Sequence, residues 1–218
     1  MPELRPLVAT DEGGSYELPP QETSIAVCVS VIDLGHQENK TFNNVSRQVL
    51  ITWELPTQIM QDERPFVVSK FYTVSLNEKA NMRHMLESWR GAAFTEEEIK
   101  QGFELKKLLG RWCNLSVIHK ERNGKVRADI SGIVALLKEQ KAKLSKIKVF
   151  NDLVYLDFAN FNYDVFQSLP EWIQKIMRES LEMKAMEDAP ITVDDDDMDL
   201  VDAERNGGGP NSDDEIPF

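Results

Sequence analysis

The sequence predicts a mainly β protein with helical insertions, followed by a C-terminal helix and a disordered acidic tail. Two observations lead to this fold class. In five short segments between residues 23 and 137, apolar residues alternate with polar ones, which is the period of a strand with one buried face. From residue 187 to 218, 12 acidic residues accompany a single basic one, so this segment buries too little apolar surface to offset chain entropy.

Three strands are expected before the first helix. Ile25–Val31 and Val49–Leu55 alternate apolar with small or polar residues, and Phe66–Thr73 is rich in β-branched and aromatic residues. Gly35–Asn44 is polar and is expected to be a loop between the first two strands. Residues 1–22 contain the pairs Gly13-Gly14 and Pro19-Pro20 and are expected to form an irregular N-terminal arm.

Helices and a hairpin are expected next. Asn77 is a suitable cap for a helix from Glu78 to Arg90, which Gly91 ends. Thr95 and Glu98 have the spacing of a capping box and predict a second short helix. Two further alternating segments then flank Asn-Gly at 123–124, the favoured two-residue turn of a β-hairpin.

Five strands with a helix between the third and the fourth have the element order of the OB-fold, a small Greek-key barrel. The sequence therefore predicts an OB-fold-like five-stranded barrel, an inference from element order alone. Lys138–Lys148 is a basic linker, Phe150–Phe158 is a candidate edge strand, and Pro170 opens the last helix.

Charge and composition limit the class of protein. The whole chain carries a net charge of −12, and residues 187–218 account for −11, so the first 186 residues are nearly neutral. Basic side chains of this body are thus free to gather on one face. Cys28 and Cys113 are far apart and sit among apolar residues, as buried structural cysteines do. No apolar run reaches membrane-spanning length and no signal-peptide core is present, so a cytoplasmic protein without a membrane partner is expected.

Nothing in the sequence indicates an enzyme. The histidines at 36, 84 and 119 have no ligand spacing to one another or to cysteine, and neither a phosphate-binding loop nor a nucleophile elbow is present. Asp194–Asp197 is a run without the rigid spacing of a two-metal site. We expect no catalytic residue, no metal site and no cofactor.

Binding to a single nucleic acid strand needs basic groups for phosphates and aromatic faces on which bases stack. The predicted second, third and fourth strands and the hairpin supply both kinds of residue. Trp53 shares the strand parity of Val49 and Ile51, so the alternative to DNA binding is that it packs in the core. For the basic residues around the turn, the alternative is that they are simply solvated. Trp89 and Trp172 lie on apolar helix stripes and are expected in the core. The candidate DNA-binding residues are Arg47, Trp53, Phe66, Lys70, Tyr72, Trp112, His119, Lys120, Arg122, Lys125 and Arg127.

The last six residues are Asp213, Asp214, Glu215, Ile216, Pro217 and Phe218. This segment resembles the acidic C-terminal tip of bacterial single-stranded DNA-binding proteins, which end in acidic residues followed by Ile-Pro-Phe. The resemblance implies that the tip binds replication, recombination and repair proteins. Residues 64–130 also resemble bacteriophage replication-region proteins, through Arg-Pro-Phe-Val-Val-Ser-Lys (64–70), Leu-Glu-Ser-Trp-Arg-Gly (86–91) and Gly-Phe-Glu-Leu-Lys-Lys-Leu-Leu-Gly (102–110).

Together these observations predict four parts: an arm (1–22), an OB-fold-like single-stranded DNA-binding domain (23–137), a basic linker with a C-terminal helix (138–186) and a disordered acidic tail with a partner-binding tip (187–218). The expected function is to coat exposed single strands, in the host cytoplasm if a phage encodes the protein. Self-association is a further possibility. A recombination mediator and an interaction module that does not bind DNA are the alternatives.

Overall fold

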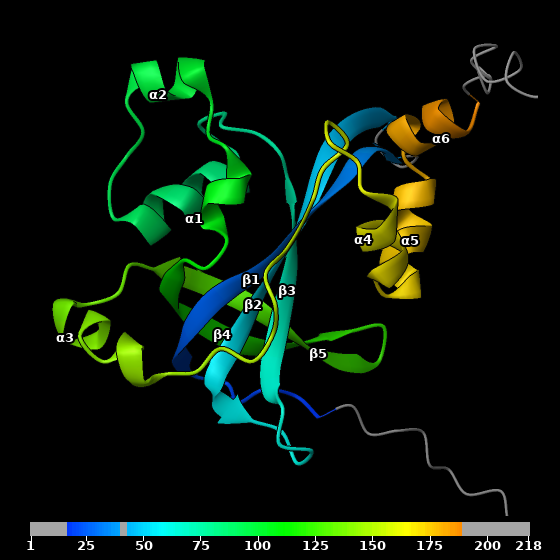
Figure 1. Ribbon diagram of the computed structural model, residues 1–218. Coiled ribbons are helices and arrows are strands. Elements are labelled where there is room, and N and C mark those ends of the chain that lie inside the picture. Colours follow the sequence, from blue (N-terminus) through cyan, green and yellow to red (C-terminus); the bar gives the residue numbers. More distant parts are fainter. Residues whose placement is uncertain (1–16, 40–42, 189–218) are drawn as a thin grey trace, which may run out of the picture.

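In the computed structural model, which describes residues 17–39 and 43–188, the central strand of the sheet is β1 (Thr23–Asn39). One edge of β1 pairs with β2 (Asn44–Ile59), which pairs in turn with β3 (Pro65–Thr73). The other edge of β1 is shared by β4 (Trp112–Arg122), at residues 23–27, and β6 (Val154–Leu156), at residues 30–32. β5 (Lys125–Val134) completes the order β3-β2-β1-β4-β5 (Figure 1). All these pairings are antiparallel except that of β6 with β1.

The mainly β architecture with helical insertions is thus confirmed, but the loop predicted over Gly35–Asn44 is wrong. β1 continues to Asn39, because a register shift between Asp33 and Gly35 turns the strand without ending it. Gly35 has a φ of +72°, which favours glycine, and an added Cβ would lie 2.6 Å from Oε2 of Glu182. Gly35 therefore lies in a β-bulge, and the absence of a side chain leaves room for Glu182 of the C-terminal part of the chain to pack against it.

The predicted helices between β3 and β4 are present, and the first of them starts later than predicted. α1 (Asn81–Arg90) begins after Glu78, because the Asn77 side chain accepts a hydrogen bond from the Lys79 N–H in a preceding turn. Gly91 ends α1 in the left-handed conformation, as predicted.

The capping box of α2 (Glu96–Gln101) is also confirmed. Thr95 accepts a hydrogen bond from the N–H of Glu98, and the Glu98 carboxylate accepts one from the N–H of Thr95. A 3₁₀ turn, η1 (Leu105–Leu108), follows and leads into β4.

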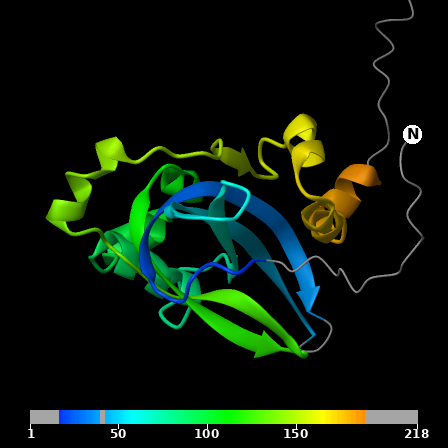
Figure 2. The same cartoon turned by 90° about the horizontal axis from the view of Figure 1, so that it is seen from below.

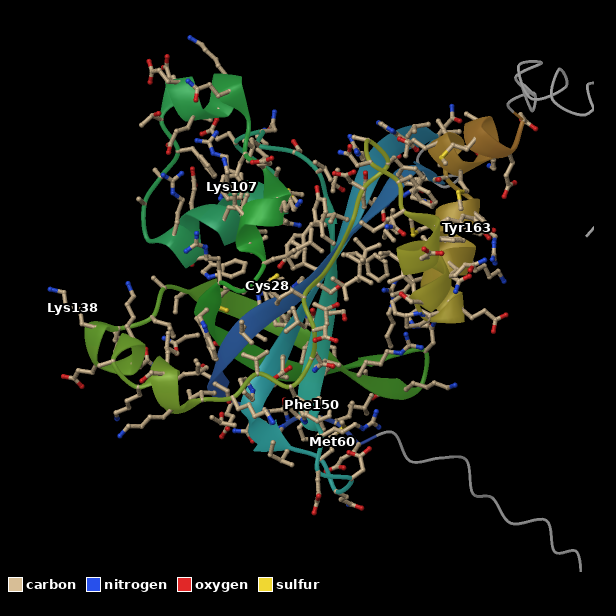
Figure 3. The ribbon with its side chains drawn as sticks, in the orientation of Figure 1. Cys28, Met60, Lys107, Lys138, Phe150 and Tyr163 are labelled. Carbon is tan, nitrogen blue, oxygen red and sulfur yellow. The ribbon has the colours of Figure 1, made fainter. Side chains whose placement is uncertain are left out.

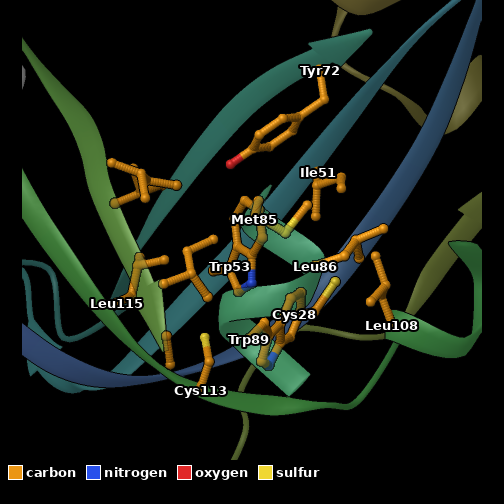
Figure 4. Packing of buried hydrophobic residues seen from close by; sticks show 14 of the residues in the cluster. Cys28, Ile51, Trp53, Tyr72, Met85, Leu86, Trp89, Leu108, Cys113 and Leu115 are labelled. Atoms are coloured by element: carbon orange, nitrogen blue, oxygen red, sulfur yellow. The ribbon is translucent and has the colours of Figure 1, made fainter. Parts of the chain in front are cut away.

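The first core lies between the inner face of the sheet and α1 (Figure 4). The Trp53 and Trp89 rings meet there with centroids 5.8 Å apart. Cys28 and Cys113 are both buried with free thiols, as expected of structural cysteines. Burial raises the pKa of the Cys28 thiol to about 12, so at neutral pH it is an unreactive hydrophobic group.

A second core covers the outer face of β1 and β2, so the prediction that β1 has only one buried face is wrong. α4 (Tyr163–Ser168), α5 (Glu171–Arg178) and α6 (Leu181–Glu187) pack there. The buried residues of this second core are Ile32, Leu34, Leu50, Leu156, Phe166, Leu169, Ile173, Met177 and Met183. Two helices, α3 (Lys138–Lys141) and the 3₁₀ turn η2 (Leu144–Lys146), occupy the predicted basic linker.

The predicted edge strand is shortened to the three residues of β6, and Pro170 caps the penultimate helix in place of the last one. Among the described residues, no helix is both long and apolar enough to cross a lipid bilayer. Most of the predicted tail, from residue 189 onward, lies outside the described residues.

Candidate nucleic-acid interface

The β4–β5 hairpin extends beyond the rest of the sheet and carries most of the predicted basic residues (Figure 1). Asn123 and Gly124 form its turn with φ angles of +54° and +71°, which confirms the predicted two-residue hairpin. Because both backbones are left-handed, the flanking strands keep their twist and their register up to the turn.

That register places four cations on one face. Lys120 lies opposite Arg127, and Arg122 lies opposite Lys125, and residues directly opposite in a ladder share a face. All four side chains are exposed. Lys120 is paired with Asp129, whereas Arg122, Lys125 and Arg127 have no ion pair with any described residue. We call these four residues the hairpin basic face.

Lys70, another predicted basic residue, is engaged within the protein. Lys70 extends from β3 to β5, where its Nζ donates to the Ile130 carbonyl at 2.5 Å and lies 3.2 Å from Oδ1 of Asp129. Burial acts to raise the pKa of Asp129, but hydrogen bonds from Lys120 and Lys70 hold it below its usual value. Lys70 therefore joins the two end strands of the sheet, and its exposure to a ligand is limited.

Arg47 and His119 are likewise occupied. The Arg47 guanidinium binds the buried carboxylate of Asp33, and this hydrogen bond raises the pKa of Arg47. His119 lies on the face of β4 opposite to Lys120, and its Nε2 is 2.8 Å from the carbonyl of Pro19. Both side chains are engaged in contacts with other parts of the protein, so they are poor candidates for contacts with phosphates.

The prediction that Trp53, Phe66 and Tyr72 stack on bases is wrong, because their rings are buried at 0%, 5% and 6% exposure. All three have the parity that points into the first core, and the core alternative for Trp53 is confirmed (Figure 4). Burial raises the pKa of the Tyr72 hydroxyl, in keeping with a ring removed from water.

Two exposed aromatic rings that the sequence analysis did not select lie together instead. Phe71, on the outer face of β3, is 47% exposed, and Trp172 of α5 is 49% exposed although it was expected in the core. Their ring centroids are 6.3 Å apart in an edge-to-face arrangement. Strand alternation placed Phe71 on the outer face, but no local pattern indicated that α5 would pack beside it.

The hairpin turn and helices α4–α6 lie on the same side of the molecule, opposite α3 (Figures 1 and 2). The hairpin basic face and the Phe71–Trp172 pair thus combine cations and exposed rings on one side. Trp112, the remaining predicted residue, is half-buried at the far end of β4 from the turn, where it lines a separate cavity.

The tip, Asp213–Phe218, lies outside the described residues. Neither a scan against protein-family models nor a search of curated proteins finds a match to this chain.

Proposed function

We propose that the protein is a non-enzymatic single-stranded DNA-binding protein that coats exposed strands during DNA replication, recombination and repair. The observation that carries the proposal is the hairpin basic face, where three exposed cations have no acidic partner among the described residues. Cations without partners are suited to replace the counterions of a phosphate backbone. The Phe71–Trp172 pair offers sequence-independent stacking surfaces on the same side.

The arrangement of the strands supports an OB-like barrel as the scaffold. β1 lies between β2 and β4, as in that fold, and Lys70 connects β3 to β5, the two strands whose approach would close a barrel. In OB-folds the loop between the fourth and fifth strands contacts the nucleic acid, and the hairpin basic face occupies the corresponding place. The tip would then recruit partner proteins.

A second candidate is an interaction module that does not bind DNA. The observation in its favour is that α4–α6 cover the outer face of β1 and β2, part of the surface through which OB-folds bind oligonucleotides. DNA binding therefore has to rely on the hairpin and on the outer face of β3.

Binding of fluorescent oligo-dT at several salt concentrations separates the two candidates. We expect Arg122→Ala, Lys125→Ala and Arg127→Ala combined to weaken binding and to reduce the slope of log affinity against log salt by about 0.7 per lost contact. The hairpin should still fold, because these side chains are exposed and its turn is unchanged.

Lys143→Ala, Lys146→Ala and Lys148→Ala combined are the matched control, since they remove the same charge from exposed positions between α3 and β6. This control should keep the slope of the unmodified protein. A hairpin variant with the original slope, or the same loss in both variants, would show that the hairpin basic face is not the DNA site.

A further inference from the structure

A cavity of about 610 Å³ lies at the end of the β4–β5 hairpin away from its turn, between α1, η1 and the α3 segment. Its floor is apolar and contains the buried side chains of Leu86, Trp89, Leu108 and Leu136. The volume falls within the range of about 300–1,000 Å³ that is usual for ligand pockets. Neither the hairpin basic face nor the Phe71–Trp172 pair contributes to it.

The rim of the cavity is cationic. Arg90, Lys107, Arg111 and Lys141 line it, and all four are exposed. Arg90 is paired with Glu98 and Lys107 with Glu104, whereas Arg111 and Lys141 have no ion pair with any described residue. Figure 3 shows Lys107 and Lys138 on this side of the molecule. The complementary ligand is therefore an apolar group next to carboxylates.

The chain itself contains such a segment. Asp213, Asp214 and Glu215 are followed directly by Ile216, Pro217 and Phe218. The 24 residues between Asp188 and Asp213 span at most about 80 Å when fully extended. A domain of this size is about 40 Å across, so the segment can reach the cavity of its own molecule.

We propose that the tip, Asp213–Phe218, docks in this cavity of the same molecule. Phe218 and Ile216 would contact the apolar floor, and the three acidic residues would face Arg111 and Lys141. Docking within one molecule is favoured because a tethered segment acts at an effective concentration of about millimolar. The consequence is regulatory: a partner protein must displace the tip before it binds, which lowers its apparent affinity by the docked fraction.

The test places a photoreactive benzoyl-phenylalanine at position 218 of the full chain and maps the cross-links by mass spectrometry. A mixture of isotopically light and heavy protein distinguishes links within a molecule from links between molecules. We expect links within one molecule to peptides that contain the cavity residues. Links between molecules, links to the hairpin, or no link to the cavity would overturn the proposal.

Paired charge reversals sharpen the test. Arg111→Glu with Lys141→Glu should abolish the cross-link, whereas Arg122→Glu with Lys125→Glu, an equal charge change on the hairpin, should retain it. All four residues are exposed, so circular dichroism should show both variants folded. The readout needs no DNA, so it succeeds or fails independently of the proposed function. Loss of the cross-link only in the hairpin variant would place the tip on the hairpin basic face instead.

Discussion

Beside the packing of the second core, the Glu182 carboxylate of α6 links the C-terminal helices to β1. Its Oε2 accepts a hydrogen bond of 2.7 Å from the backbone N–H of His36, and its Oε1 lies against Nδ1 of the same residue. Burial acts to raise the pKa of Glu182, but these hydrogen bonds hold it below its usual value. A carboxyl with a depressed pKa stabilises the fold above its unfolded pKa and loses that contribution as the pH falls through its folded pKa.

Replacing Glu182 by Gln should therefore destabilise the protein at neutral pH and matter progressively less below about pH 4. Urea unfolding midpoints of both proteins between pH 7 and pH 3 measure the difference. Glu187→Gln is the control, because Glu187 lies on the same helix, is exposed, and its side chain has no hydrogen bond or ion pair with a described residue. A constant difference across this range would mean that the Glu182 charge is not what stabilises the contact.

Phe71 of β3 and Trp172 of α5 form an exposed edge-to-face pair where α5 packs beside β3. If a base stacks there, Trp172→Ala should weaken oligo-dT binding by roughly 1–3 kcal/mol while the salt slope stays the same, because no phosphate contact is lost. Phe150→Ala is the control: this ring is exposed to a similar extent, at 59%, but lies away from α5 (Figure 3). Equal affinities of the Trp172 and Phe150 variants would exclude stacking at the pair.

Elements fixed by local chemistry were predicted from the sequence, and elements fixed by distant contacts were not. The capping box of α2 and the Asn123–Gly124 turn depend on neighbouring residues, so their patterns were sufficient. Strand alternation placed Phe71 and Tyr72 on opposite faces of β3, but it could not show which of these faces would be buried in the core. One C-terminal helix opened by Pro170 was predicted and is present as α5, but α4 and α6 were not predicted. The position of these helices was also missed, because an apolar stripe does not identify the strand that it will cover, here Ile32 and Leu34 of β1.

Across the whole molecule, charge is divided between a nearly neutral body and residues 189–218, which carry ten acidic residues and one basic residue. If the hairpin basic face binds DNA as proposed, such a segment should compete with the DNA, because its negative charges resemble those of a strand of phosphates. An effective concentration of about 1 mM against a dissociation constant of about 100 µM would lower the apparent DNA affinity about tenfold. Screening by salt reduces this competition, since the Debye length falls from about 30 Å at 0.01 M to about 8 Å at 0.15 M.

Replacing the ten acidic residues after Asp188 by Asn and Gln should consequently tighten oligo-dT binding about tenfold at low salt, and much less at 0.15 M and above. The substitution keeps the full chain length, so any change in affinity reflects charge. Phe218→Ala removes the aromatic ring but none of the ten charges, and it should leave DNA affinity within about twofold, because the effect depends on carboxylates. Affinities measured by fluorescence anisotropy at 0.01 M and 0.15 M salt decide the matter. If the neutral variant and the unmodified protein bind equally at 0.01 M salt, the acidic segment does not compete for the hairpin basic face.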